Sequence, residues 1–303
     1  MTGARRPTRG IAEETQEPLP PTTWNRHVLH WGAKTHVMAI LNLTPDSFSG
    51  DGLGGNTAVA LSAALRAVDD GADMLDLGAE STRPGHVPIS AEEELARLIP
   101  VLTAIRARTE ILLSVDTSKA AVAAEAIAAG ADLINDVRGF TADPEMAAVV
   151  AQAGVPAVIM HDVPPEHEDD LMTSILRELS RRLDRAVAAG VVWERLIVDP
   201  GFGFGKDWRQ NLELLRRFGE LKALGRPILA GTSRKSMIGR VLGVPEDDRL
   251  EGTAATVSLA IAGGADIVRV HDVRAMVRVA RMTYAVVHGA PQVPLRWPGA
   301  PRP

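Results

Sequence analysis

Charged and amide side chains recur in this sequence directly after short apolar runs. The residues at these positions are Asn42, Asp76, Asp116, Asn135, His161, Asp199, Ser233 with Lys235, and Arg269 with His271. Carboxylates and amides bind polar small molecules through hydrogen bonds, and clustered cations bind phosphates. We expect these residues to form one site if the fold brings the ends of the runs together.

Two acids and an amide among them suit a flat heterocycle. Asp116 and Asn135 end neighbouring runs, and Asp199 ends a later one. A carboxylate accepts two parallel N–H bonds from a guanidine-like ring edge, as it does from arginine. Any one aspartate is about as often a loop or helix cap as a ligand. Three acceptors that meet at one mouth favour a binding role.

The cations of the last two positions predict an anion site. Ser233 and Lys235 follow an apolar run and open a helix, where backbone N–H groups, hydroxyls and cations together bind anions. Arg269 and His271 are two residues apart in an extended run, so both point to the same side. A lone histidine more often has a structural role, but beside Arg269 a phosphate role is the better interpretation.

Two polar segments add further candidates. Residues 42–52 include Asp46 and form a long loop, which is typical of a lid over a site. Thr82 and Arg83 offer a hydroxyl and a forked cation for phosphate oxygens. Turns and helix caps have similar compositions, so neither segment decides the function alone.

The glycine-rich segment 201–206 superficially resembles nucleotide-binding loops. Gly201 and Gly205 are one residue too close for the Walker pattern, and Lys206 stands where the third glycine of the dinucleotide pattern belongs. We interpret the segment as a flexible loop whose Phe202 or Phe204 covers an aromatic substrate.

The apolar runs alternate with alanine- and leucine-rich amphipathic segments, which predicts alternating strands and helices. The predicted strands are residues 36–41, 72–77, 111–115, 133–137, 156–160, 196–198, 228–230 and 267–270. Predicted helices include residues 58–68, 92–105, 119–129 and 175–189. This pattern is α/β and predicts a (β/α)8 TIM barrel, in which all strand ends meet at one face. A doubly wound open sheet is the alternative, but it gathers ligands at one switch point, so polar residues at all eight ends favour the barrel.

Composition bounds the classes of function. Of 303 residues, 46% are hydrophobic and 23% charged, which is enough apolar material for a core. A net charge of −5 argues against a nucleic-acid partner, and the absence of cysteine excludes disulfides and thiolate metal sites. No apolar stretch is long enough for a membrane span, and residues 1–30 lack the apolar core of a secretory signal, so we expect a cytoplasmic protein.

One domain is expected, with two flanking segments. Residues 31–288 contain the alternating pattern and form the predicted barrel. Residues 1–30 are rich in Arg, Glu, Pro and Thr and are predicted to be a mobile leader, and residues 289–303 form a proline-rich tail. Neither segment has the apolar periodicity that would recover its ordering entropy by burial.

The motifs, in this order, closely resemble those of dihydropteroate synthase, the folate-pathway enzyme that sulfonamides target. The matching segments are LNLTPDSFS (41–49), DLGAESTRPG (76–85), SVDT (114–117), INDV (134–137), DPGFGFGK (199–206), SRKS (233–236) and RVHD (269–272). The resemblance covers residues 36–288, and seven ordered motifs are far more specific than any single one.

The resemblance implies that 6-hydroxymethyl-7,8-dihydropterin diphosphate condenses with p-aminobenzoate and releases diphosphate. It also implies a Mg²⁺ ion on the diphosphate and a homodimer. The implied pterin-binding residues are Asp116, Asn135, Asp199 and Lys235, with Arg269 stacked over the ring. The implied diphosphate residues are Asn42, Arg269 and His271, with Asn42 near the magnesium. The implied p-aminobenzoate pocket is Thr82, Arg83, Pro84, Phe204, Lys235 and Ser236, and Asp46 is placed to steady the cationic pterin.

One segment departs from the family pattern. The family commonly has Met-His-Met and a glycine-containing loop after the fifth strand, whereas this chain has Met160-His161-Asp162 and an acidic stretch. This loop borders the pterin side, so two alternatives stay open. One is a non-catalytic relative that keeps the pterin pocket. The other is a methyltetrahydrofolate-dependent methyltransferase, against which the cations suited to diphosphate argue.

Overall fold

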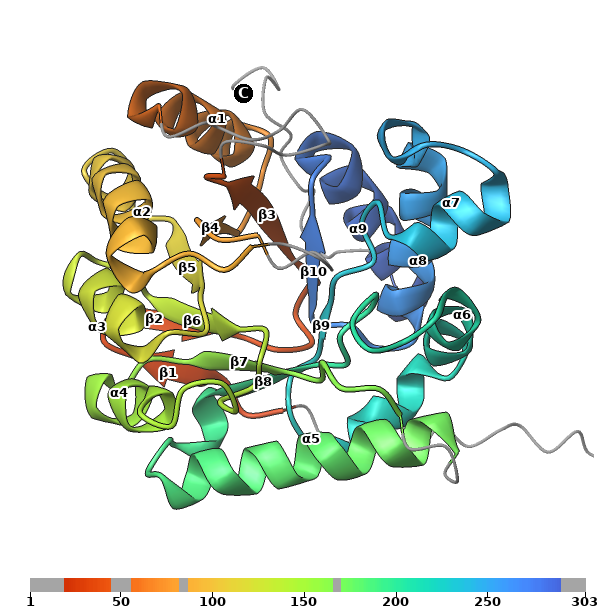
Figure 1. Cartoon of the computed structure of the whole chain (residues 1–303). Helices are drawn as coiled ribbons and strands as arrows, with labels where there is room; N and C mark the ends of the chain where they lie inside the picture. Colours follow the sequence, from red (N-terminus) through yellow and green to blue (C-terminus); the bar gives the residue numbers. More distant parts are fainter. Residues whose placement is uncertain (1–18, 45–55, 82–86, 166–169, 290–303) are drawn as a thin grey trace, which may run out of the picture.

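Eight parallel strands form the centre of the computed structural model, which describes residues 19–44, 56–81, 87–165 and 170–289. The strands are β3 (His36–Asn42), β4 (Met74–Gly78), β5 (Leu112–Asp116), β6 (Leu133–Asp136), β7 (Ala157–Met160), β8 (Leu196–Asp199), β9 (Leu229–Ala230) and β10 (Ile267–Val270). They pair in the order β8-β7-β6-β5-β4-β3-β10-β9, and a parallel bridge between Val198 and Ile228 links the two outer strands (Figure 1). The (β/α)8 barrel is therefore confirmed, and the open sheet is excluded.

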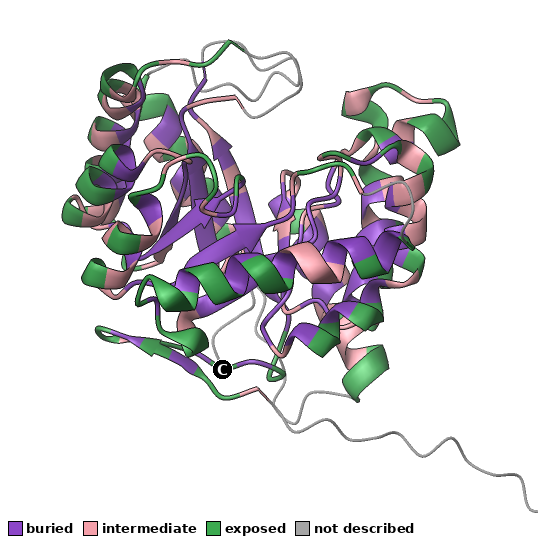
Figure 2. Ribbon diagram, turned by 60° about the horizontal axis from the view of Figure 1, so that its bottom comes forward, coloured by how far each residue is buried: buried purple, intermediate pink, exposed green. Residues whose placement is uncertain are grey.

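Helices surround the strands on the outside. They are α1 (Thr57–Asp69), α2 (Ala91–Arg106), α3 (Ala120–Ala128), α4 (Met146–Ala153), α5 (Leu171–Ala188), α6 (Trp208–Arg216), α7 (Ser236–Leu242), α8 (Leu250–Ala262) and α9 (Val273–His288). Helix α5 shows why they pack this way, because Ile175, Leu179 and Leu183 lie four residues apart and are all buried. Figure 2 shows the same division, with buried strands inside and helices whose outer faces are exposed.

The strands are apolar because most of them are buried on both faces. Every residue of β4 is buried, including Asp76 and the leucines before and after it, Leu75 and Leu77. Alternate residues of a strand point into the barrel and toward the helices, so runs without polar alternation suit this fold. Among the described residues, no helix is long and apolar enough to cross a membrane.

The predicted mobile leader is partly wrong. Strands β1 (Thr22–Trp24) and β2 (His27–Leu29) form an antiparallel hairpin within residues 19–30. Trp24 is buried, and the Thr22 hydroxyl donates to the Glu194 carbonyl at 2.6 Å, just before β8 begins. The hairpin therefore lies against the amino-terminal ends of the strands, opposite the polar ends. Burial of the Trp24 side chain stabilises the ordered hairpin and offsets the conformational entropy lost on ordering it. The polar composition of the segment does not indicate this contribution. Residues 1–18 and 290–303 lie outside the described residues, so the rest of the leader and the tail stay predictions.

Candidate active site

Four polar side chains from four strands meet inside the carboxyl end of the barrel. Asp76 of β4 is fully buried, and its Oδ2 accepts hydrogen bonds from Asn135 Nδ2 of β6 at 3.0 Å and from Arg269 Nε of β10 at 2.6 Å. Arg269 Nη2 donates to Asp116 Oδ2 of β5 at 3.1 Å. Asp116, Asn135 and Arg269 are brought together as predicted, and Asp76 is the residue that joins them.

Two carboxylate oxygens in this cluster lack a hydrogen-bond donor. Asp76 Oδ1 and Asp116 Oδ1 are buried, and no described group donates to either. Burial raises the pKa of Asp116 well above its usual range, although the Arg269 guanidinium opposes the rise. A buried acceptor without a donor is costly, and an N–H-rich ligand would remove that cost. The cluster is therefore built for a ligand that brings donors.

Asp199 adds an acceptor at the end of β8. Its Oδ1 accepts the backbone N–H of Gly201 at 2.7 Å. Burial raises its pKa from 3.8 to about 6, while the Gly201 N–H and the nearby charges of Lys235 and Arg269 oppose the rise. The Lys235 ammonium lies 4.5 Å from the centre of the Phe204 ring, which is a cation–π contact. Asp199, Lys235 and Phe204 therefore border the same space.

The structure distinguishes the two phenylalanines of the glycine-rich loop. Phe202 is buried and stacks on Phe218 with ring centroids 6.1 Å apart, so it belongs to the core. Phe204 is only partly buried and touches Lys235 at the mouth. Of the two predicted covers for an aromatic substrate, only Phe204 is in position.

The loops after β9 and β10 are joined to each other. The Ser233 hydroxyl accepts the backbone N–H of His271 at 3.2 Å and lies 3.0 Å from His271 Nδ1. Arg234 lies between Ser233 and Lys235, and its guanidinium pairs with Asp272 at 2.8 Å. Ser236 is the exposed first residue of α7. The predicted anion-binding hydroxyl, cation and histidine thus come from adjoining loops.

The remaining predicted residues divide into two groups. Asn42 ends β3, is half-buried and lies in register with Gly78 of β4, so it is at the carboxyl end of the barrel. Four others lie outside the described residues, and their placement stays a prediction. These are Asp46, Thr82, Arg83 and Pro84.

Sequence reasoning missed Lys206 as a functional element. Its ammonium is buried, donates to the carbonyls of Phe204 at 2.8 Å and Gly201 at 3.1 Å, and lies 3.0 Å from His161 Nδ1. Burial lowers its pKa to about 7. Lys206 therefore fastens the loop that carries Phe204. The sequence feature that indicates this role is a lysine at the end of a glycine-rich segment, because the backbone carbonyls of such a loop need a hydrogen-bond donor.

Comparisons with known proteins identify the class. Residues 38–271 match the family model described as pterin binding enzyme. The dihydropteroate synthase of Clostridium beijerinckii is 48% identical over 257 residues, which cover 84% of this chain and 96% of that one. The Clostridium difficile enzyme, solved in the presence of pteroic acid, has a TM-score of 0.81 at 48% identity, with 84% of this chain and 98% of that one covered. The Yersinia pestis enzyme, solved as a sulfonamide drug complex, has a TM-score of 0.84 at 42% identity, with 88% of this chain and 99% of that one covered.

A pterin-binding barrel is thus the class that the fold and the matched model define. With such identity over most of both chains, the chain belongs to the dihydropteroate synthase family. This confirms the resemblance drawn from the motifs, and with it a transferase of folate biosynthesis.

Proposed function

We propose that this chain condenses 6-hydroxymethyl-7,8-dihydropterin diphosphate with p-aminobenzoate, giving 7,8-dihydropteroate and diphosphate. The observation that carries the proposal is the pair of buried carboxylate oxygens, on Asp76 and Asp116, that lack donors beside a fixed arginine. Support also comes from the Clostridium difficile relative, which was solved with pteroic acid, a pterin joined to p-aminobenzoate.

The pterin ring is assigned to the inner part of the mouth. Its guanidine-like edge presents N–H donors that fit Asp116 Oδ1, and its other polar atoms fit Asn135, Asp199 and Lys235. Arg269 is held in one orientation by two carboxylates, so its planar face is available to the ring. Binding replaces missing donors with ligand donors, which is the source of the affinity.

The diphosphate is assigned to the outer part, over the loops after β9 and β10. Ser233 and His271, which contact each other, and Arg269 supply a hydroxyl, an imidazole and a guanidinium for its oxygens. Mg²⁺ would neutralise charge on the leaving diphosphate when bound there. The residues fit such an ion, because Asn42 offers an amide oxygen and Mg²⁺ commonly takes most of its ligands from substrate phosphates and water. Within the described residues, no cluster of three acidic or histidine side chains could hold a metal without the substrate.

The p-aminobenzoate is assigned to the space beside Phe204 and Lys235. Phe204 offers a ring face, and Lys235 and Ser236 offer polar groups at its border. Thr82, Arg83 and Pro84, which lie outside the described residues, are assigned to the same pocket by the family resemblance.

The chemistry needs positioned charges and no side-chain nucleophile. The bond between the pterin methylene carbon and the diphosphate oxygen breaks, and the electron pair leaves with the diphosphate. The dihydropterin ring delocalises the positive charge that develops, and Asp46 is assigned to steady it. The amine of p-aminobenzoate then forms the C–N bond and loses a proton. Arg269 and His271 favour the first step because they stabilise the charge on the leaving group.

The direct test is an assay of the purified chain with both substrates and Mg²⁺. We expect diphosphate and dihydropteroate to form in equal amounts. Removal of Mg²⁺ with a chelator should stop the formation of both products, and addition of Mg²⁺ should restore it. Pterin binding without turnover, under conditions in which the dihydropteroate synthase of Clostridium beijerinckii is active, would favour the non-catalytic alternative. Methyl transfer from methyltetrahydrofolate would favour the methyltransferase.

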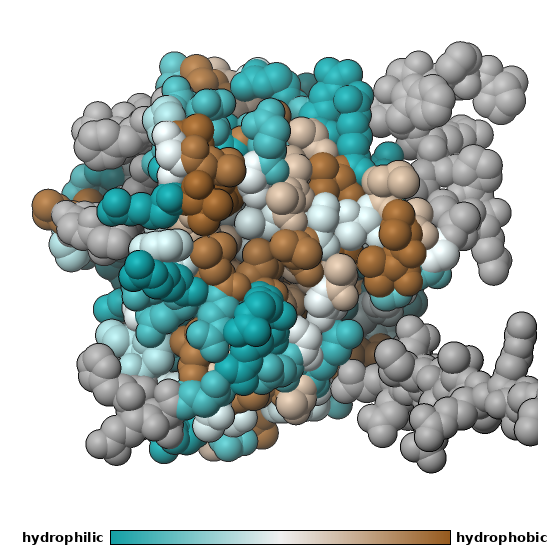
Figure 3. Space-filling view, turned by 90° about the vertical axis from the view of Figure 1, so that its right-hand side faces the viewer, coloured by the Kyte–Doolittle hydropathy of each residue, from teal (hydrophilic) through white to brown (hydrophobic). Residues whose placement is uncertain are grey.

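The proposal includes a homodimer. Helices α7, α8 and α9 expose apolar side chains outward: Val241, Leu242, Leu250, Leu259, Met282 and Val286. Figure 3 faces the side of the molecule on which α6 to α8 lie in Figure 1, and it shows apolar surface flanked by polar side chains. Exposed apolar side chains gathered on one side of a molecule are typical of a protein interface, and twofold dimers are the commonest homo-oligomers. The cytoplasmic location expected from composition stays a prediction.

A further inference from the structure

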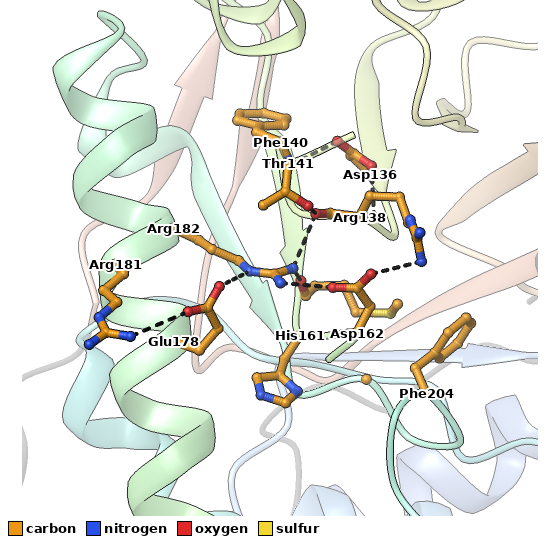
Figure 4. Close-up of polar contacts among 12 residues, drawn as sticks. Asp136, Arg138, Phe140, Thr141, His161, Asp162, Glu178, Arg181, Arg182 and Phe204 are labelled. Carbon is orange, nitrogen blue, oxygen red and sulfur yellow. Dashed lines mark hydrogen bonds and ion pairs between the residues drawn. The ribbon is translucent and has the colours of Figure 1, made fainter. Parts of the chain in front are cut away.

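A buried arginine on α5 spans the two loops that border the pterin side of the barrel. Arg182 is only 1% exposed. Its Nη1 donates to the carbonyls of Met160 at 2.5 Å and Arg138 at 3.1 Å, and its Nε donates to Glu178 Oε1 at 2.8 Å (Figure 4). One side chain on an outer helix thus holds the end of β7 and the loop after β6 at the same time.

Asp162 completes this cluster where the chain departs from the family pattern. Its carboxylate is 6% exposed and forms ion pairs with Arg182 Nη2 at 2.8 Å and with Arg138 Nη1 at 2.9 Å. Figure 4 shows Asp162 between the two guanidinium groups. Each oxygen of this buried carboxylate is therefore within ion-pair distance of a guanidinium, while Oδ1 has no aligned hydrogen bond.

The loop after β6 has a backbone shape that depends on the same contacts. The Asp136 carboxylate accepts the backbone N–H groups of Arg138 at 2.8 Å and Phe140 at 2.9 Å. Gly139 and Phe140 both have left-handed φ angles, of 57° and 62°. A Cβ atom on Gly139 would lie 2.6 Å from both Arg182 Nη1 and the Met160 carbonyl oxygen. Arg182 thus packs into the space that only glycine leaves free.

Residues of the proposed pterin pocket lie on β6 itself and on β8, the strand that pairs with β7. Asn135 precedes Asp136 on β6, and alternation along the strand points Asn135 inward to Asp76 while Asp136 points outward. Met160 lies in register with Asp199 of β8. Any shift of the strand ends held by Arg182 therefore moves pocket residues.

We propose that Arg182, together with Asp162, is a positioning residue that holds the pterin wall of the site by locking the loops after β6 and β7. The proposal rests on the proposed function for its kinetic consequence. Its structural consequence, the protection of the two loops in the ligand-free chain, does not depend on any activity.

The test compares Arg182→Met with Arg181→Met. Arg181 is the next residue on α5, is exposed, and contacts Glu178 at 3.9 Å without reaching either loop. We expect Arg182→Met to raise the KM for the pterin diphosphate about tenfold, because a misplacement of about 1 Å can cost about 100-fold and loosened loops displace the binding groups by less. The KM for p-aminobenzoate should rise less, because Lys235 and Ser236 stand at the start of α7, whereas the bonds of Arg182 go to the loops after β6 and β7. Arg181→Met should match the unsubstituted chain in both.

Hydrogen exchange of the ligand-free chain supplies the independent measurement. Amides of residues 137–141 and 160–163 should exchange faster in Arg182→Met and not in Arg181→Met. If Arg182→Met does not fold, Asp162→Asn serves instead, because it removes the ion pairs and leaves the bonds of Arg182 to the two carbonyls. We expect the same pattern with a smaller effect.

The outcomes separate the two proposals. Equal rises in both KM values, or unchanged exchange in the two loops, would overturn the positioning role. A folded but inactive unsubstituted chain would overturn the proposed function, while the exchange comparison would still decide the role of Arg182.

Discussion

Asp76, Asp116 and Asp199 place three carboxyl groups in the interior of the barrel mouth. Burial raises the pKa of Asp116 and Asp199, which means that the folded chain disfavours their charged forms. The chain keeps these groups although they weaken its own stability, as binding sites commonly do. We expect a bound ligand to compensate for this cost, because its N–H groups supply the missing hydrogen-bond donors. Function and stability should therefore oppose each other at these positions.

Replacement of Asp199 by asparagine should stabilise the chain at neutral and alkaline pH. The folded carboxyl has a pKa of about 6 against an ordinary 3.8, so the cost of ionising it in the folded state is complete above pH 6 and absent below pH 4. The free energy of unfolding at pH 8 should rise by about 1 to 3 kcal/mol, since a change of one in pKa corresponds to about 1.4 kcal/mol. Urea unfolding from pH 3.5 to 8 measures this. Asp184→Asn, at an exposed position of α5, controls for loss of one negative charge, and an equal gain at pH 3.5 would contradict the argument.

Removal of the Lys235 side chain should weaken pterin affinity and rate together. Its ammonium lies near Asp199 and over Phe204, so it serves both proposed substrate pockets. We expect Lys235→Ala to lower kcat/KM for the pterin diphosphate by about 100-fold, as the loss of one charged donor commonly does. Lys34→Ala is the matched control, because Lys34 pairs with Asp73 at the other end of the barrel. Near-normal steady-state kinetics of Lys235→Ala would refute its assigned role.

At the scale of elements, the site depends on loops that buried backbone and side-chain contacts hold in place. The loop after β8 leaves the strand at Gly201, which has a left-handed φ of 71°. A Cβ atom there would lie 1.9 Å from the carbonyl oxygen of His161, so the loops after β7 and β8 approach each other too closely for any side chain. Lys206 then bonds to the carbonyls of the loop. The position of Phe204 follows from both features.

Alanine at Gly201 should therefore cost much more than alanine at a glycine with the same backbone and free space. Gly225 has a φ of 61°, and a Cβ atom added there would have no neighbour within 4 Å, so it isolates the backbone effect. We expect about 1 kcal/mol for Gly225→Ala and more than about 3 kcal/mol for Gly201→Ala, from left-handed strain plus the clash. Chemical denaturation of the two variants gives the comparison, and equal costs would show that the loops separate easily.

Much of the fold could be predicted from the sequence because strand and helix periods are local. The eight predicted strands lie within two residues of the observed ones, and the polar residues that end them meet as expected, including Asp116, Asn135 and Arg269. The hairpin at residues 22–29 was missed because its stability comes from buried Trp24 and contacts with distant residues. Arg182 was missed for a related reason. Its partners, the carbonyls of Met160 and Arg138, carry no side-chain signal.

At the scale of the whole molecule, the barrel has one end closed by the hairpin and a functional end opposite. The helices on one side, α7 to α9, leave large apolar side chains in contact with solvent. A monomer gains nothing from that exposure, whereas a second copy would bury it at about 25 cal/mol per Å². The proposed dimer therefore accounts for the exposed apolar side chains of α7 to α9, which have no role in the proposed active site.

A charge on this surface should separate the subunits. Leu259 of α8 is 58% exposed, and Leu259→Glu is expected to shift the chain from dimer to monomer at micromolar concentration because an interface core excludes unpaired charge. Val187→Glu, at an exposed position of α5, is the control and should leave the mass unchanged. Sedimentation velocity distinguishes the species. A monomeric unsubstituted chain at the same concentration would contradict the dimer.

Side chains from separate strands are expected to bind one pterin at the barrel mouth, and the other substrate assignments depend on this binding. A crystal structure of the chain soaked with 6-hydroxymethylpterin tests it most directly. We expect the N–H edge of the ring within hydrogen-bonding distance of Asp116 Oδ1, with Asn135 and Asp199 on its other polar atoms. A ring bound elsewhere, with Asp116 Oδ1 still lacking a donor, would contradict the proposed site.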